Sequence, residues 1–425
     1  MNEVISIIDN FNQVSLHDPS PEILEVYKHI PEINELDPRG FPMCRPLFSH
    51  SDVPSFLGAI NIKIEEFKWD RDFVYSVMLH HNNGLAAKHL NLIPEKIQQQ
   101  IKLKKCKLIL DNTLEGHTID WFLDEAYNSI SELNLPAEQI YYITNNLFAE
   151  EVAKEYNNLN SIKNPINVLS FMYNVKDIKR LVRLGELPKS INVREEYEYK
   201  KINISNTKHA LKLNRTGRPE RNLLMLHINK KDYYDKINLS FPELHDYGEY
   251  SELFSDISGE ENIRDVITKL PFDIDETDET NHGEPGYGVG RFNADLPFRP
   301  VHYKNSFFSI VMCAFPFIDA CHLHSSTFNP IYCGHPILQF GPHKHLVELK
   351  KRGFITFDRW WDESYDNIED GWERLKKVLE ILDNLLILDR SELLKMYEEM
   401  IPVLQHNSDL IQNYDVKLNL IDRIL

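Results

Sequence analysis

The chain has 425 residues, of which 42% are hydrophobic and 26% are charged, as in an ordinary soluble globular protein. This length exceeds what one hydrophobic core usually organises, so we expect two domains of about 150–200 residues each. The formal net charge of −18 at pH 7 argues against a general nucleic-acid or membrane-surface coat, because such proteins carry a basic surplus.

The N-terminus and the cysteines argue against secreted, membrane-spanning, disulfide-rich and zinc-binding proteins. The first apolar stretch, MNEVISIIDNFNQV, is too short and too acidic for a signal peptide, and we find no apolar run near about 18 residues, so we expect a cytoplasmic protein with no membrane partner. The 5 cysteines include no CxxC pair, which argues against a disulfide framework or a structural zinc site. A group of cysteines and histidines could suggest a metal cluster, but we interpret its members as core residues because they span two predicted elements: Cys313, Cys321, Cys333, His322, His324 and His335.

Residues 73–174 alternate apolar strands with amphipathic helices, which predicts a parallel sheet built from βαβ units. We predict strands at 107–110, 140–143 and 168–171, and a helix at 119–133. Asp111, Glu115 and His117 follow the first of these strands, at the end where such sheets bind ligands, and they are our candidates for a general base. The alternative for Asp111 is that it caps the following turn. His80 and His81 are weaker candidates.

Residues 181–208 are polar and charged without a steady period, so we place the inter-domain connection there. The predicted parts are an N-terminal acceptor-side domain at 1–205, a C-terminal nucleotide-binding domain at 206–371, and C-terminal helices at 372–425. Residues 176–231 hold 15 Lys and Arg against 6 Asp and Glu, which suggests either a local anionic ligand or a solvated, lysine-rich linker.

A second βαβ block follows, with strands predicted at 209–213 and 237–240 and a helix at 219–228. The loop between the first strand and the helix carries Arg215, Arg218 and Arg221. Guanidinium groups bind phosphate oxygens in pairs, and a helix N-terminus adds unpaired N–H groups, so this loop predicts a diphosphate site. The alternative is a solvated loop with ion pairs to acidic segments.

Residues 248–300 are acidic and rich in loops, which are commonly functional when this long. Asp273-Ile274-Asp275 has the form of a metal-binding DxD motif but follows no buried strand, so we interpret it as a solvated acidic loop and predict no metal. The glycines between 283 and 290 lack the spacing of a dinucleotide or P-loop motif.

Residues 324–357 read as a helix, a strand and a second helix joined by glycine turns, half of a nucleotide-binding α/β layer. The predicted bounds are 327–332, 336–340 and 343–352, and the apolar spacing after residue 372 predicts a long helix followed by others. The residues expected to bind the donor or its phosphates here are Ser325, Ser326, Thr327, Gly334, His335 and Gly341. His343 is a further hydrogen-bond donor candidate.

The residues that carry a family resemblance are Phe307-Phe308-Ser309-Ile310-Val311, Thr327-Phe328, Pro330-Ile331, Gly334-His335-Pro336, Gly353-Phe354-Ile355-Thr356-Phe357, Asp362-Glu363-Ser364-Tyr365-Asp366, Asn214-Arg215, Arg218-Pro219, Asp111 and Glu115-Gly116. They resemble GT-B-type glycosyltransferases, most nearly phage and large-virus proteins distantly related to α-1,3-fucosyltransferases. The resemblance implies an α/β fold of two Rossmann-like domains facing a cleft, with C-terminal helices crossing back onto the first. Where that family has Glu-Lys and Glu-Thr pairs, this chain has Ser325-Ser326 and Cys313-Ala314.

The resemblance implies a glycosyltransferase that uses a nucleoside-diphosphate sugar as co-substrate and needs no cofactor or metal. If the protein is viral, modified bases in DNA are the first acceptor candidate and the host cytoplasm the location; a glycan or protein hydroxyl is the second. The rival expectation is a catalytically degenerate nucleotide- or glycan-binding adaptor, because the two pairs are replaced.

Overall fold

The structure is a computed structural model, and it describes residues 6–8, 60–62, 73–78, 90, 93, 95–112, 118–172, 174–175, 178–179, 182, 185, 187–214, 217–244, 251–272, 300–313, 316–414 and 423–424. It divides into two compact units. The first comprises residues 1–173 and 415–425, and the second comprises residues 174–414.

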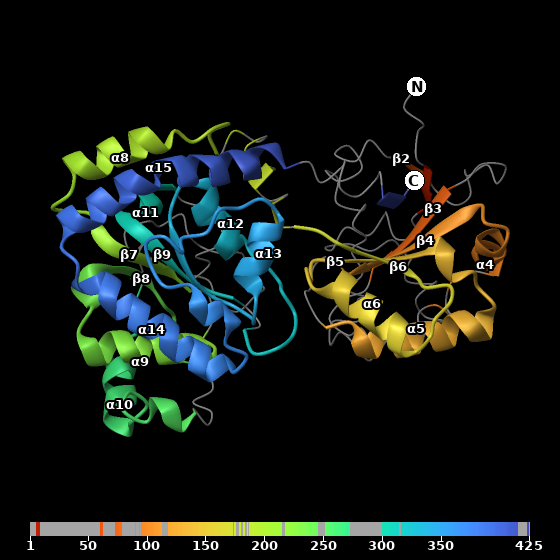
Figure 1. Ribbon diagram of the computed structural model, residues 1–425, viewed down its shortest axis with the longest axis horizontal. Coiled ribbons are helices and arrows are strands. Elements are labelled where there is room, and N and C mark those ends of the chain that lie inside the picture. Colours follow the sequence, from red (N-terminus) through yellow and green to blue (C-terminus); the bar gives the residue numbers. More distant parts are fainter. Residues whose placement is uncertain are drawn as a thin grey trace, which may run out of the picture. The chain divides into compact units, whose positions relative to one another are not determined.

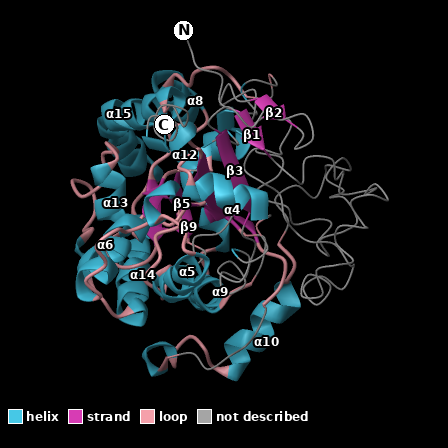
Figure 2. Cartoon of the chain, turned by 90° about the vertical axis from the view of Figure 1, so that its right-hand side faces the viewer, coloured by secondary structure: helices cyan, strands magenta, loops and turns pink. Residues whose placement is uncertain are grey.

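The first unit is built on a six-stranded sheet in the order β2-β1-β3-β4-β5-β6. All its strands are parallel: β1 (Ser6–Ile8), β2 (Ile60–Ile62), β3 (Phe73–Met78), β4 (Cys106–Asn112), β5 (Ile140–Thr144) and β6 (Asn167–Ser170). Figure 2 shows β1, β2 and β3 side by side in magenta. The predicted strands at 107–110, 140–143 and 168–171 are therefore confirmed within one or two residues.

Three helices follow the strands of this unit: α4 (Glu95–Lys102), α5 (Asp120–Leu133) and α6 (Ala149–Leu159). The inward face of α5 carries Phe122, Ala126 and Ile130 at helical spacing, and all three are buried in the core of the unit. The helix ends at Asn134, whose left-handed backbone (φ 51°) lets its N–H reach the carbonyls of the last turn. This confirms the helix predicted at 119–133.

The second unit is built on a four-stranded parallel sheet in the order β10-β9-β7-β8. Its strands are β7 (Lys208–Leu213), β8 (Ile237–Ser240), β9 (Ser306–Met312) and β10 (Ile337–Phe340). Its helices are α8 (Val193–Ile202), α9 (Pro219–Lys231), α10 (Glu260–Lys269), α11 (Pro300–Lys304), α12 (Ser325–Tyr332), α13 (His345–Lys351), α14 (Gly371–Ile387) and α15 (Arg390–Asn413). In Figure 1, α9 and α14 lie on one side of this sheet and α8, α12 and α15 on the other.

The predicted fold class, α/β with parallel sheets in two parts, is confirmed. The strands expected at 209–213, 237–240 and 336–340 match β7, β8 and β10. The helices expected at 219–228, 327–332 and 343–352 match α9, α12 and α13.

The division of the chain differs from the predicted boundary at 205/206. Residues 174–205 belong to the second unit, because α8 packs against α15 and α11 there. The predicted C-terminal part at 372–425 is also split. Helices α14 and α15 pack within the second unit, and residues 415–425 belong to the first.

The C-terminal residues are joined to the first unit by two polar contacts. The guanidinium of Arg423 donates to both carboxylate oxygens of Glu150, at 3.0 and 2.9 Å. The ammonium of Lys107 on β4 donates to the carbonyl of Ile424. The Arg423 pair is bidentate, which is the strongest geometry for this ion pair. These contacts explain why the last residues group with a sheet that is distant in sequence.

Candidate functional site at the carboxyl edge of the second sheet

The strand order of the second unit places a topological switch point between β7 and β9. From β7 the chain passes through α9 to β8 on one side, whereas from β9 it passes through α12 to β10 on the other side. The two connections leave the sheet in opposite directions at the carboxyl ends of adjacent strands. Open α/β sheets bind ligands at this position. The residues that follow β7 and β9 are therefore the first place to look for a site.

The first turn of α9 brings basic and acidic groups to the switch point. Arg218 is the N-cap residue, in extended conformation, and Pro219 begins the helix. One terminal nitrogen of Arg221 lies 3.5 Å from the carbonyl oxygen of Met312, the last residue of β9. This contact joins the β7 connection to the β9 connection across the switch point.

A buried charge cluster lies beneath that turn. Glu220 is 2% exposed, and its Oε1 is 3.7 Å from Nε of Arg221. Burial raises the pKa of Glu220, while its own backbone N–H and then Arg221, Arg218 and Lys212 lower it in part. Lys212, on β7, is also 2% exposed. Burial raises the pKa of the neighbouring Cys313 thiol to about 12, so this cysteine is an uncharged member of the cluster at neutral pH.

The first turn of α12 forms the opposite side of the switch point. Oγ of Ser325 is 2.8 Å from Nδ1 of His324, the N-cap residue. Ser325 and Ser326 are half-buried, whereas Thr327 is fully buried. Helix N-termini carry unpaired N–H groups and a partial positive charge, and both favour anions. Two such N-termini, those of α9 and α12, begin after adjacent strands.

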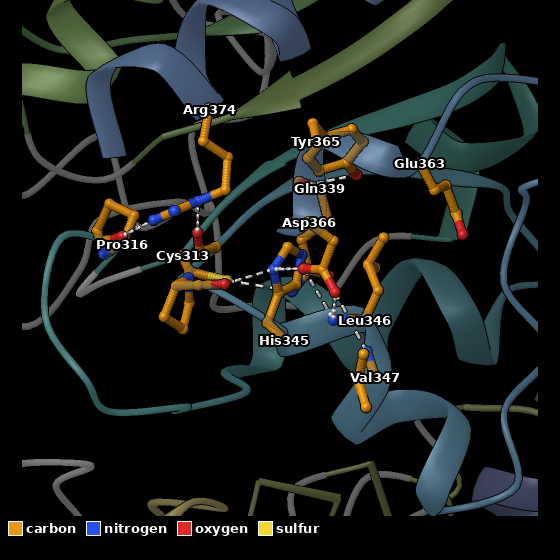
Figure 3. A network of polar contacts seen from close by, with 12 residues as sticks. Cys313, Pro316, Gln339, His345, Leu346, Val347, Glu363, Tyr365, Asp366 and Arg374 are labelled. Atoms are coloured by element: carbon orange, nitrogen blue, oxygen red, sulfur yellow. Dashed lines mark hydrogen bonds and ion pairs between the residues drawn. The ribbon is translucent and has the colours of Figure 1, made fainter. Parts of the chain in front are cut away.

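The end of β10 adds a third group of buried polar side chains (Figure 3). Nδ1 of His345 is 2.8 Å from the carboxylate of Asp366 and 2.8 Å from the carbonyl of Pro342. Both partners accept hydrogen bonds, so Nδ1 carries a proton and donates it to them. Arg374 donates from Nε to the carbonyl of Gly341 at 2.9 Å and from Nη2 to that of Pro316 at 2.6 Å.

Five buried polar atoms without a hydrogen-bond partner among the described residues lie at this edge of the sheet: Nδ2 of Asn214, Oε1 of Glu220, Oγ1 of Thr327, Oε1 of Gln339 and Nε2 of His345. Two further ones in this unit, on His209 and Trp361, lie away from it. Each of the five belongs to the second half of a strand, the residue after it, or the first turn of the next helix. Buried polar groups are normally paired, so a concentration of unpaired ones marks a place that takes polar ligand atoms or solvent.

The structure separates the predicted donor-binding residues into two groups. Arg218, Arg221, Ser325, Ser326, Thr327 and Gly341 belong to the carboxyl edge described above. Gly334 and His335 precede β10 and lie at the opposite, amino-terminal edge. The site prediction for these two residues is corrected on this ground. A strand of four residues spans about 13 Å, so the two edges are far apart for one phosphate group.

The roles of Gly334 and His335 are structural. Gly334 has φ +63°, and an added Cβ would lie 2.5 Å from Cγ2 of Val193 on α8. His335 is buried, with Nδ1 2.8 Å from Oγ of Ser309 and Nε2 2.8 Å from the carbonyl of Ser306. Burial and the nearby charge of Lys200 hold the pKa of His335 well below its usual range. A neutral histidine with both nitrogens bonded to the protein is a core residue.

Several predicted residues lie outside what the structure describes. Arg215, Glu115 and His117 are among them, as are the acidic motif at 273–275 and the glycines at 283–290. Asp111 lies in β4, at the register position beside Met78 and Ile143, but its side chain is outside the described atoms. The base candidates therefore stay predictions.

The sequence reasoning missed Lys212, Glu220, Gln339 and His345. Gln339 had a usable signal, since it interrupts an otherwise apolar strand at a position that a purely structural strand fills with an aliphatic residue. Among the described residues, no group of three or more His, Cys, Asp and Glu side chains could hold a metal ion. No described helix is both long and apolar enough to cross a membrane.

No protein-family model matches this chain, and no curated protein matches it either. Among solved structures, a trehalose-6-phosphate synthase studied with bisubstrate glycomimetics is similar at TM-score 0.38 and 10% identity, over 96% of this chain and 97% of that one. The N-terminal domain of Candida albicans trehalose-6-phosphate phosphatase gives 0.37 and 9%, over 81% and 70%. An E. coli trehalose-6-phosphate structure bound with UDP-2-fluoro glucose gives 0.33 and 10%, over 96% and 99%. Similarity at this level carries no inference about the site.

Proposed function

We propose that this protein is a glycosyltransferase that moves a sugar from a nucleoside-diphosphate sugar to an acceptor hydroxyl, with the diphosphate bound at the carboxyl edge of the second sheet. The observation that carries the proposal is the switch point between β7 and β9, where Arg218 and Arg221 begin the connection after β7, Arg221 contacts the end of β9, and the connection after β9 leads to α12. The resemblance of the Asn214-Arg215 and Arg218-Pro219 segments to GT-B proteins supports the same conclusion.

The chemistry follows from where charge develops. Breaking the bond between the sugar and the diphosphate leaves negative charge on the leaving phosphate. The guanidinium groups of Arg218 and Arg221 and the N–H groups of two helix N-termini would stabilise that charge in place. The acceptor hydroxyl must lose a proton, and Asp111, Glu115 and His117 remain our proposed base candidates. No cofactor or metal ion enters this scheme.

The donor site is tested by binding nucleoside diphosphates to single-residue variants. We expect Arg221→Ala and Arg218→Ala each to weaken binding by about 10–100-fold, because each removes a charge-assisted hydrogen bond. Arg264→Ala is the matched control, since Arg264 lies on α10 and its side chain is 77% exposed. Equal affinities for all four proteins in calorimetry would refute the phosphate site.

Turnover is tested separately from binding. A panel of nucleoside-diphosphate sugars should show donor hydrolysis or transfer, and nucleotide binding without turnover on any acceptor would favour the degenerate adaptor instead.

For the acceptor, DNA with modified bases and a glycan or protein hydroxyl are the proposed classes. Lys200 and Lys212, two cations of the basic segment 176–231, are buried and unable to contact DNA. Absence of both heparin retention and salt-dependent DNA binding would remove the DNA class.

A further inference from the structure

Glu220 places a negatively charged group beside the arginines that are proposed to bind the diphosphate. Its carboxylate is buried in the first turn of α9, next to Arg221 and two residues after the α9 N-cap at Arg218. A ligand phosphate that approaches these arginines therefore meets a carboxylate in the same electric field. Two anions this close, away from solvent, repel each other strongly.

The groups that act on this carboxylate come from three elements. Arg218 and Arg221 belong to α9, Lys212 comes from β7, and Cys313 follows β9. The thiol of Cys313 is neutral at ordinary pH, because burial raises its pKa to about 12. The carboxylate of Glu220 thus lies in the field of three cationic side chains.

The geometry of the carboxylate leaves it able to change its charge. Oε1 of Glu220 is buried and makes no hydrogen bond to the described residues, and its nearest recorded cationic nitrogen is 3.7 Å away. The carboxylate of Asp366, by comparison, accepts a hydrogen bond of 2.8 Å from His345 and two backbone N–H bonds, and its net pKa is lowered. Glu220 has the hydrogen bond from its own backbone N–H, but burial outweighs it and raises the pKa of Glu220.

We propose that Glu220 is an internal competitor for the anion site, ionised in the free protein and protonated when a phosphate-bearing ligand binds beside Arg218 and Arg221. The proton comes from the solvent and adds to a carboxylate oxygen, and no other bond changes. Binding of the ligand's anion and uptake of a proton are then coupled. This inference rests on the proposed diphosphate site and adds its regulation by pH.

The sign of the coupling follows from linkage. If the bound state holds one more proton than the free state, affinity rises as pH falls through the pKa of Glu220. The ligand has its own titration near neutral pH, which acts in the opposite direction, because a more highly charged phosphate binds cations better. Comparison of the wild-type protein with Glu220→Gln at each pH cancels the ligand's contribution, since glutamine resembles the protonated acid in shape and charge.

The experiment measures binding of inorganic pyrophosphate by calorimetry to the full-length wild-type chain, Glu220→Gln and the control Glu261→Gln. Glu261 is an exposed residue in the first turn of α10. At about pH 8 we expect Glu220→Gln to bind about 50–100-fold more tightly than wild type, the equivalent of nearly two pKa units and the shift that uptake of almost one proton requires. At about pH 5 the two affinities should converge, and Glu261→Gln should follow wild type throughout.

Proton uptake is measured on the wild-type protein alone, so the proposal stays testable if the variant does not fold. Binding enthalpies in two buffers of different ionisation enthalpy should show uptake approaching one proton per pyrophosphate at about pH 7. Pyrophosphate binding with no proton uptake and no difference between wild type and Glu220→Gln would overturn the role of Glu220 alone. Absence of pyrophosphate binding to every protein would overturn the proposed donor site as well.

Discussion

His345 and Asp366 form a fully buried hydrogen-bonded pair at the start of α13, with Nδ1 2.8 Å from Oδ1. The same carboxylate accepts the backbone N–H groups of Leu346 and Val347 at 3.2 and 3.3 Å. Burial raises the pKa of Asp366, but the hydrogen bond and charge of His345 and these N–H groups lower it by more, so the net pKa is below its usual value. The carboxylate is therefore ionised and stabilises the folded state.

Asp366→Asn should destabilise the protein by about 2–3 kcal/mol at neutral pH, because it removes a charged acceptor from buried donors. A carboxylate whose pKa is lowered by folding contributes stability above its unfolded pKa of about 4, and loses it as pH falls through the folded value. The difference between wild type and variant in urea unfolding should thus shrink below about pH 4. The exposed Asp362→Asn control should change stability by less than about 0.5 kcal/mol. A pH-independent difference would contradict this account.

Gly341 permits the imidazole of His345 to lie against the backbone. A Cβ at this position would be 2.7 Å from Cγ of that ring, which is pinned by Asp366 and cannot move away. We expect Gly341→Ala to cost about 1–3 kcal/mol in denaturant unfolding, the usual size for overpacking. The control Gly259→Ala should cost only a few tenths, because nothing lies within 4 Å of its added Cβ.

The interpretation is checked with the double variant Gly341→Ala/His345→Ala. Since the second change removes the ring that the new methyl group strikes, the two destabilisations should not add, with a coupling of at least about 0.5 kcal/mol. Additive effects would mean that the strain lies elsewhere.

The fold was largely predictable where strands are mainly apolar. β9 and β10 are such strands and are buried along their whole length, so local composition and tertiary environment agree. Helix α8 was not predicted, because its inward positions are Val193, Tyr197 and Lys200, and a lysine breaks the apolar period. That lysine is buried only because Tyr303, Lys304 and Ser306 offer it carbonyl oxygens, which no local pattern reveals.

The site was predictable in part, for a similar reason. Arg221 and Thr327 could be assigned to strand-to-helix connections from sequence, and the structure shows that these connections follow adjacent strands. His335 could not be separated from Gly341 in this way, because both flank the same strand, and only strand direction shows that one precedes β10 and the other follows it. The burial of Glu220 could not be predicted, because it depends on how α9 packs on the sheet and not on the local residue pattern.

Lys200 gives the stability of the second unit a dependence on pH. Its ammonium is fully buried and donates to the carbonyls of Tyr303, Lys304 and Ser306 at 2.7, 3.0 and 2.6 Å. Burial lowers its pKa to about 7. The unfolded lysine has a pKa of about 10.4, so between these values the unfolded chain holds a proton that the folded chain lacks. The free energy of unfolding should therefore rise with pH across this window.

Lys200→Met removes both the titrating group and the donor to three carbonyl oxygens. The variant should be less stable than wild type, and the gap should widen from about pH 7 to about pH 9.5 by at most about 1.4 kcal/mol per pH unit. Lys201→Met, an exposed neighbour on α8, controls for loss of one positive charge. If the gap in chemical unfolding stays constant with pH, Lys200 does not titrate in this range.

Ser326 offers a gain-of-function test of the donor site. It is half-buried in the first turn of α12, where the resembling glycosyltransferases have the lysine of a Glu-Lys pair. In this chain the phosphate charge would fall on Arg218 and Arg221, so an added ammonium at the facing helix N-terminus should raise pyrophosphate affinity. For Ser326→Lys we expect about a tenfold increase, reduced by added salt, from one new charge-assisted contact. Ser255→Lys, at an exposed position in the same unit, adds the same charge away from the switch point. Should both lysine variants bind pyrophosphate equally, net charge and not the α12 N-terminus would account for any gain, and the diphosphate would have to be placed elsewhere.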